Sequence, residues 1–283
     1  MIRLDQALVE RGLCDSRECA KRAILAGQVR VNGQPARKPS DSVKPDDALT
    51  LDAGEKFVSR GGHKLEHALE HFQLDVTGLV ALDLGASTGG FTDCLLQRGA
   101  VRVFAVDVGR GQLAWKLRKD KRVVVMEKTN ARFLTLEHFA EPAQKHSTFN
   151  IQHRTSKPAR TKSPSALGVE CLMLNVSSEP PADIITIDCS FISLKKILPA
   201  AAALLKPAGK IIALIKPQFE AGKAEADKGR GVITDATIHE RVIHELRDFV
   251  SAQAGLRWRD VVESPLLGPA GNKEFLVLIE KTC

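Results

Sequence analysis

The sequence predicts an α/β protein in which a mostly parallel sheet carries helices on both faces and follows a small α+β module. From residue 79 onward, short apolar runs alternate with helical patterns, which is typical of a parallel sheet. Residues 1–50 show a different pattern, with two short helices and a hairpin. The length of 283 residues suits one larger domain with a small additional one.

Helix-capping residues and a turn motif predict the N-terminal module. A short amphipathic helix over about 4–12 ends at glycine, and Ser16 is expected to cap a second helix that stops at Gly27. Val29 and Val31 then alternate into Asn32-Gly33, which indicates a tight hairpin turn, and residues 49–51 supply a closing strand.

In the larger domain, five apolar runs predict buried strands, at 80–84, 103–107, 123–126, 183–188 and 210–216. Helical patterns are expected at 87–98, 112–118, 194–205 and 237–252, with a turn at Pro207–Gly209 after the third. Two last strands, near 258–263 and 274–280, are joined by a short loop rich in Pro and Gly. This predicts an antiparallel end to the sheet.

A linker at Glu55–Gly62 enters a helix at about His63, so we divide the chain into 1–60 and 61–283. Residues 145–181 stand where only a short connection between two strands is expected. The first part of this segment is basic, rich in Ser, Thr and Pro, and free of acids as far as residue 164. We expect a flexible surface insertion, and a basic arm that grips RNA is the alternative.

Composition limits the class of protein. The formal net charge of +7 is compatible with a polyanionic partner but does not identify one. No apolar run approaches the roughly 20 residues that a membrane span needs, and the N-terminus has no apolar signal core. The six cysteines form no C-x-x-C pair and no zinc-ligand spacing. We therefore expect free thiols, a cytoplasmic protein, no membrane partner and no metal site.

The strongest motif is LDLGASTGGFT at residues 82–92. A strand ends at Asp83, and Gly85, Gly89 and Gly90 follow before a helix. Such glycines let the backbone approach a ligand, and the helix N-terminus offers free N–H donors. Asp107, at the end of the next strand, is placed to bind a ribose diol. The spacing of the glycines favours S-adenosylmethionine over NAD as the cofactor.

Four ionisable residues stand near strand ends. Asp188 and Lys216 end two strands, Lys64 lies on the helix before the sheet, and Glu274 starts the last strand. Each one alone is better explained as a surface charge, but the carboxyl edge of such a sheet is where ligands bind. A ribose 2′-hydroxyl is a poor nucleophile, and a positioned neutral lysine can accept its proton. Together the four residues indicate a catalytic site.

The N-terminal module has a basic face. Arg17, Lys21 and Arg22 share one side of the second helix, and Arg30 and Lys38 belong to the hairpin region. Basic residues so grouped suit RNA phosphates, and we place Arg3 with them. The alternative is a charged face that is simply solvated.

At these residues the sequence resembles known families. LDQALVERGL and SRECAKRAILAGQVRVNG resemble the S4 RNA-binding domain. SRGGHKLEHAL, LDLGASTGGFTDCLLQRGA, DCSFISL, LIKPQFE and GPAGNKEFL resemble the TlyA, or hemolysin A-like, family of S4-plus-FtsJ-like methyltransferases. The resemblance implies a Rossmann-like class I fold with a seven-stranded sheet whose last strand is antiparallel. It also implies 2′-O-methylation of cytidine in the ribosomal RNA of ribosomal subunits, with S-adenosyl-L-methionine as donor.

The resemblance also implies residue roles. It gives a catalytic tetrad of Lys64, Asp188, Lys216 and Glu274, with Lys216 as the base. The implied cofactor-binding residues are Asp83, Gly85, Ser87, Gly89, Gly90, Asp107, Asn130 and Ala131. The segment at 145–181 departs from the family pattern.

Two alternatives to this function remain open on the sequence. One is an RNA-binding protein whose methyltransferase domain is inactive, against which the intact glycine loop and complete tetrad argue. The other is a membrane-active hemolysin, which the lack of a spanning segment and of an apolar amphipathic helix opposes.

Overall fold

The computed structural model describes residues 1–51, 56–139 and 181–282. The chain forms two compact units, at 1–58 and 59–283. The insertion expected at 145–181 lies, apart from its last residue, outside the described residues. No helix in the described part of the chain is long and apolar enough to cross a membrane.

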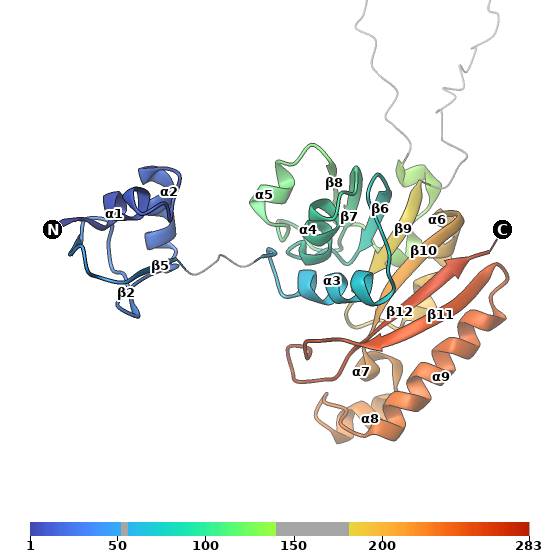
Figure 1. The fold of residues 1–283 in the computed structure, drawn as a ribbon. Helices are drawn as coiled ribbons and strands as arrows, with labels where there is room; N and C mark the ends of the chain where they lie inside the picture. The colour runs from blue at the N-terminus through green and yellow to red at the C-terminus, as the bar shows by residue number, and fades with distance from the viewer. Residues whose placement is uncertain (52–55, 140–180, 283) are drawn as a thin grey trace, which may run out of the picture. The chain divides into compact units, whose positions relative to one another are not determined.

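The first unit packs two helices against short strands (Figure 1). Its helices are α1 (Leu4–Glu10) and α2 (Arg17–Leu25), and its strands are β1 (Ile2–Arg3), β2 (Val29–Val31), β3 (Gln34–Pro35), β4 (Ser42–Val43) and β5 (Leu49–Leu51). Strand β2 pairs with both β3 and β5, and β1 pairs with β4. Leu4, Leu8, Ile24 and Val29 are among the buried residues of its core.

Local signals in the sequence explain this unit. The Ser16 hydroxyl accepts a hydrogen bond from the backbone N–H of Cys19 and caps α2, as predicted. Asn32 and Gly33 both have positive φ, at 51° and 80°, between β2 and β3. Two successive positive φ angles are the requirement of a tight hairpin turn, so the predicted hairpin is confirmed.

The second unit contains a seven-stranded sheet in the order β11-β12-β10-β9-β6-β7-β8. The strands are β6 (Val80–Leu84), β7 (Arg102–Val106), β8 (Val123–Met126), β9 (Ala182–Ile187), β10 (Leu205–Ile215), β11 (Leu256–Glu263) and β12 (Phe275–Lys281). The pairs from β10 to β8 are parallel, and β12 is antiparallel to both β10 and β11. This is the predicted mostly parallel sheet with an antiparallel last strand.

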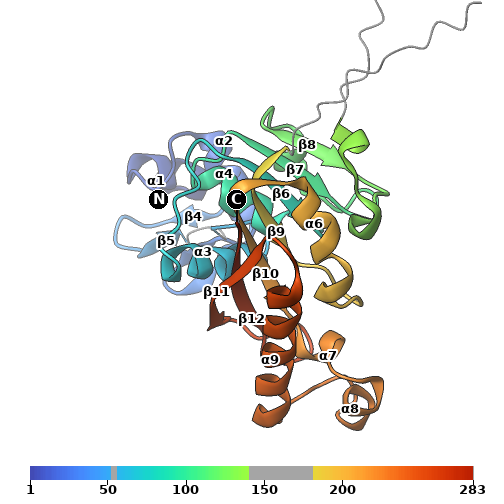
Figure 2. The ribbon, with the colours of Figure 1, turned by 90° about the vertical axis from the view of Figure 1, so that its right-hand side faces the viewer.

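Helices cover both faces of the sheet (Figure 2). The helices are α3 (Gly61–His71), α4 (Gly90–Gln97), α5 (Trp115–Arg118), α6 (Leu198–Leu204), α7 (Pro217–Glu220), α8 (Lys223–Lys228) and α9 (Ala236–Ala252), with 3₁₀ helices η1 (Ala131–Phe133), η2 (Leu136–Phe139) and η3 (Leu194–Lys196). Helices α6 and α9 pack their apolar residues on one face, where Leu198, Val242 and Leu246 join the strand residues in one core. Helices α3 and α4 pack together on the other side.

Three predicted elements differ from the structure. The helix expected at 87–98 begins only at Gly90, because Gly89 adopts a left-handed conformation with φ of 97°. The helix expected at 194–205 is split into η3 and α6, because Pro199 has no N–H to donate to the carbonyl four residues earlier and is accommodated only in the first turn of a helix. The turn expected at Pro207–Gly209 lies within β10, where its pairing with β9 shifts register between Leu205 and Lys210.

Candidate active site

The glycine loop lies at the carboxyl edge of the sheet, between β6 and α4. Gly85 has φ of 86°, and a Cβ atom built on it would lie 2.6 Å from the backbone oxygen of Asp188. Only glycine fits this position, because both the backbone conformation and the close approach exclude a side chain. The fit brings the end of β6 directly against the end of β9, where Asp188 begins a loop.

A first cavity, of about 460 Å³, opens beside this loop. It is lined by the ends of β6, β7 and β8, including Gly85, Ser87, Asp107, Val108, Gln112, Asn130 and Ala131. The carboxylate of Asp107 accepts hydrogen bonds from the backbone N–H groups of Ser87 at 2.8 Å and Gly109 at 2.7 Å. These bonds fix the carboxylate at the cavity wall, and its remaining lone pairs can accept from hydroxyl groups.

Asp83 and Gly89, which were expected to bind the cofactor, do not line this cavity. The Asp83 side chain is fully buried and accepts hydrogen bonds from the hydroxyls of Thr92 at 2.6 Å and Thr186 at 3.0 Å. Burial raises the pKa of Asp83 to about 6, although both hydroxyls act in the opposite direction. Asp83 on β6 therefore holds α4 and β9 in place through these two hydrogen bonds. Gly89 is the N-cap residue of α4.

A second cavity, of about 270 Å³, brings together the four residues predicted as a tetrad. Lys64 comes from α3, Asp188 follows β9, Lys216 follows β10 and Glu274 precedes β12. The Lys216 Nζ lies 2.6 Å from Asp188 Oδ1 and donates to the Ser190 hydroxyl at 3.0 Å. The Lys64 ammonium donates to the Glu274 carboxylate. Gly85, Ser87 and Gly90 line the same cavity.

The tetrad consists of two ion pairs that are largely withdrawn from water. Lys64, Lys216 and Glu274 are buried, and the Asp188 side chain is 26% exposed. A buried charge is tolerated when it is paired and hydrogen-bonded, which holds for each lysine here. The four side chains are thus fixed in place, and the cavity that they line is open to a ligand. A lysine side chain in such a cavity can exchange a proton with a hydroxyl group that reaches it.

A third cavity, of about 410 Å³, adjoins the tetrad and is more apolar. It shares Ser190, Lys216 and Glu274 with the second cavity and adds Phe191 and Phe219. Phe191 is 90% exposed, and its ring centroid lies 5.1 Å from that of Phe219. Sequence reasoning missed Ser190 and both phenylalanines. Their signal was the position of S-F and Q-F just after the two strand-end residues Asp188 and Lys216.

In the first unit, two of the predicted RNA-binding residues converge on one buried carboxylate. Arg3 and Arg17 both donate to Asp5, which is fully buried, while the two arginine side chains are about half exposed. The hydrogen bond from Arg3, with that from Arg17, holds the pKa of Asp5 at about 2. Lys21 pairs with Glu18 at 3.9 Å, Arg22 and Lys38 are exposed, and Arg30 lies on β2.

Comparison with known proteins agrees with this architecture. Residues 57–281 match the FtsJ-like methyltransferase model and residues 2–49 match the S4 domain model. The 16S/23S rRNA (cytidine-2′-O)-methyltransferase TlyA of Mycobacterium tuberculosis is 42% identical over 279 residues, which cover 97% of this chain and 88% of TlyA. Hemolysin A of Brachyspira hyodysenteriae is 35% identical over 275 residues, 97% of this chain and 98% of its own length.

A solved structure of a hemolysin from Streptococcus thermophilus superposes with a TM-score of 0.64 at 39% identity, covering 99% of this chain and 88% of that chain. These matches confirm the resemblance that the sequence motifs predicted. The chain therefore belongs to the FtsJ-like methyltransferase family, carries an S4 domain at its N-terminus and is a homologue of TlyA and hemolysin A.

Proposed function

We propose that this protein transfers a methyl group from S-adenosylmethionine to the ribose 2′-hydroxyl of a cytidine in ribosomal RNA. The observation that carries the proposal is the tetrad of Lys64, Asp188, Lys216 and Glu274, which lines one cavity beside the glycine loop. Its relative in Mycobacterium tuberculosis bears the name of this reaction at 42% identity. The substrate would be a ribosomal subunit in the cytoplasm.

The first cavity fits the proposed cofactor. Its volume is in the range of sites for ligands of this size, and Gly85 leaves room for close backbone approach. Asp107 would accept hydrogen bonds from a ribose diol, and Asn130 and Ala131 would lie along the base. When bound, the cofactor supplies an electrophilic methyl group on a sulfonium sulfur.

The tetrad would prepare the acceptor hydroxyl. Lys216 would take the proton of the hydroxyl once its ammonium has released a proton to solvent, and Asp188, 2.6 Å away, would stabilise the ammonium that forms again. The Ser190 hydroxyl holds the same nitrogen from a second side. The Lys64–Glu274 pair would fix the opposite wall of the cavity, so that the oxygen is held in line for attack.

The third cavity suits the nucleoside that carries this hydroxyl. Unpaired RNA bases stack on aromatic side chains, which hold a single-stranded nucleotide in place. Phe191 and Phe219 offer such a surface next to Lys216, and Phe191 is 90% exposed.

The S4 domain would supply affinity for the RNA backbone. Its proposed phosphate contacts are Arg3, Arg17, Lys21, Arg22, Arg30 and Lys38. Exposed arginine and lysine side chains neutralise phosphates without reading sequence, so this unit would hold the RNA while the second unit selects the nucleotide.

The test of the proposed function is methyl transfer by the variant Lys216→Ala. We expect the variant to bind S-adenosylmethionine with wild-type affinity in calorimetry but to lose roughly 100-fold or more in turnover on ribosomal subunits, since a general base contributes about that much. Lys121→Ala, an exposed lysine before β8, is the matched control. Near-normal turnover of Lys216→Ala would remove Lys216 as the base. Cofactor binding by the wild type without transfer to any ribosomal RNA would favour an RNA-binding protein with an inactive domain.

A further inference from the structure

Two residues of the tetrad, Asp188 and Lys216, lie on two loops that a residue outside the tetrad also joins. One loop follows β9 and carries Asp188, Ser190 and Phe191. The other follows β10 and carries Lys216 and Phe219. The Lys216–Asp188 pair joins the two loops at their bases, and the Phe191–Phe219 ring contact joins them farther out.

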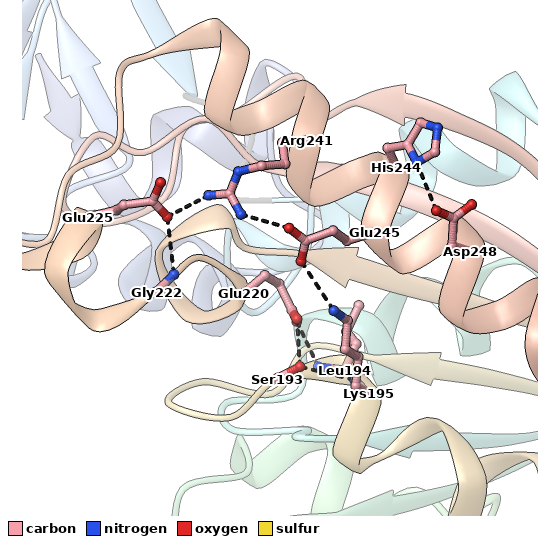
Figure 3. Close-up of polar contacts among 10 residues, drawn as sticks. All are labelled: Ser193, Leu194, Lys195, Glu220, Gly222, Glu225, Arg241, His244, Glu245 and Asp248. Carbon is pink, nitrogen blue, oxygen red and sulfur yellow. Dashed lines mark hydrogen bonds and ion pairs between the residues drawn. The ribbon is translucent and has the colours of Figure 1, made fainter.

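Glu220, at the end of α7, joins the same two loops at a third point (Figure 3). Its Oε2 accepts from the Ser193 hydroxyl at 2.6 Å, and its Oε1 accepts from the backbone N–H of Leu194 at 2.7 Å. Both carboxylate oxygens are therefore used to hold the first turn of η3, the 3₁₀ helix that ends the β9 loop. Burial raises the pKa of Glu220, so this carboxyl is not an ordinary surface charge.

Neighbouring ion pairs brace η3 from a second side. The Lys195 ammonium donates to Glu245 at 3.3 Å, and Arg241 joins Glu245 to Glu225, as Figure 3 shows. These pairs join η3, α9 and α8, and they include no residue of the tetrad and neither of the two phenylalanines. Of the interactions drawn in Figure 3, only those of Glu220 connect the two loops that carry the site.

We propose that Glu220 is a positioning residue of the methyl-transfer reaction, which fixes the Asp188–Phe191 side of the site against the Lys216–Phe219 side. The inference rests on the proposed function. Among the residues that the structure describes, the other side-chain links between the two loops are Lys216 with Asp188 and Ser190 and the contact of the two phenylalanine rings, and all of these groups are proposed to engage the RNA. A misplacement of about 1 Å at reacting groups can cost roughly 100-fold in rate, so this bridge should act on turnover rather than on cofactor binding.

The experiment measures kcat and KM on ribosomal subunits, cofactor affinity by calorimetry and thermal stability for four variants. Glu220→Ala should lower kcat by roughly 10- to 100-fold and leave cofactor affinity within about threefold. Glu220→Gln should retain most of the turnover, because its carbonyl can still accept from Leu194 and its amide can donate to the Ser193 oxygen. Ser193→Ala should lower kcat less, and the double variant Ser193→Ala/Glu220→Ala should be no worse than Glu220→Ala alone.

Val250→Ala separates positioning from loss of stability. Val250 is a fully buried residue of α9 and lines none of the three cavities, so this variant should lose stability without losing kcat. Wild-type kcat in Glu220→Ala, additive effects of the two changes, or a Gln variant as impaired as the Ala variant would each overturn the proposal. If the wild type itself transfers no methyl group, the proposed function fails instead.

Discussion

Asp5 is the residue through which the S4 domain organises two of its basic groups. It is fully buried, and Arg3 and Arg17 approach it from different elements with their side chains about half exposed. Charge-assisted hydrogen bonds of this kind fix the planes of the guanidinium groups. Arg3 and Arg17 are thus held in one orientation before any RNA arrives.

Replacing Asp5 with Asn should weaken RNA binding by roughly three- to tenfold, because the two guanidinium groups lose their fixed orientation. The direction of the change distinguishes two effects. If only charge mattered, loss of the negative charge of Asp5 would strengthen binding to the negatively charged RNA. Filter binding of ribosomal RNA at several salt concentrations measures the effect. Asp46→Asn, an exposed carboxylate of the same unit, should show no loss. Equal or tighter binding by Asp5→Asn would show that the orientation does not matter.

Asp83 should make stability depend on pH. Its pKa lies at about 6 in the folded protein against 3.8 for the free side chain, mainly because of burial. The folded state therefore binds more protons than the unfolded state between these values, and the free energy of unfolding falls as pH rises through that window. Relative to Asp83→Asn, the wild type should lose about 2 kcal/mol between pH 4.5 and 7.5 in urea unfolding. Parallel pH profiles of the two proteins would refute this.

The same residue marks a limit of prediction from sequence. The motif correctly located Asp83 at the end of a strand before the glycine loop, but the strand pattern does not say which side chains reach the ligand. Thr92 and Thr186, which occupy both of its oxygens, come from α4 and β9. Such partners are known only after the chain has folded. The four tetrad residues were predicted from strand ends because the carboxyl ends of parallel strands meet at one edge.

At the scale of elements, the turn between β6 and α4 needs glycine at position 85 for two reasons, a positive φ and a close approach to the backbone of Asp188. A Cβ at Gly85 would meet the Asp188 carbonyl, whereas Gly255, with φ of 82°, has nothing within 4 Å. Gly255→Ala should cost only the left-handed strain of about 1 kcal/mol. For Gly85→Ala, the loss in the free energy of unfolding includes the same strain. It also includes a clash with the Asp188 backbone that is relieved only if Asp188 moves.

We therefore expect Gly85→Ala to lower the free energy of unfolding by about 2–4 kcal/mol and to reduce cofactor affinity by at least tenfold. Gly255→Ala should leave cofactor affinity unchanged. Chemical unfolding and calorimetry on both variants measure the difference. Equal effects of the two substitutions would show that the close approach to Asp188 is unimportant.

Long periodic elements were predictable, and short ones fixed by tertiary contacts were not. The five apolar runs became β6 to β10, because strands covered on both faces are continuously apolar. The helix expected at 237–252 became α9, because burial of one face imposes a helical period on a long segment. Helices α7 and α8 have four and six residues and carry no periodic signal. Yet α7 positions Phe219 and Glu220, so part of the candidate site was invisible in the sequence pattern.

At the scale of the whole molecule, the residues proposed to bind RNA phosphates and those proposed to bind the cofactor lie in different units. The S4 domain carries the basic groups proposed for RNA, and the FtsJ-like unit carries the glycine loop and the tetrad. Changes in one unit should therefore leave the other unit's ligand unaffected.

Arg17→Ala combined with Lys21→Ala should lower RNA affinity and reduce the slope of log affinity against log salt by about two, because two phosphate contacts no longer release counterions. Cofactor affinity should stay at the wild-type value. RNA binding across a salt series, with calorimetry of the cofactor, gives both quantities. A salt slope equal to that of the wild type would exclude phosphate contacts by these two residues.

The tetrad is proposed to direct methyl transfer to a ribose 2′-hydroxyl of cytidine in ribosomal RNA. The most direct measurement is mapping of 2′-O-methyl groups in both ribosomal subunits after incubation with S-adenosylmethionine and either wild type or Lys216→Ala. We expect at least one new 2′-O-methylcytidine with the wild type and none with the variant. Methyl groups found only on bases, or ribose methylation undiminished in Lys216→Ala, would contradict it.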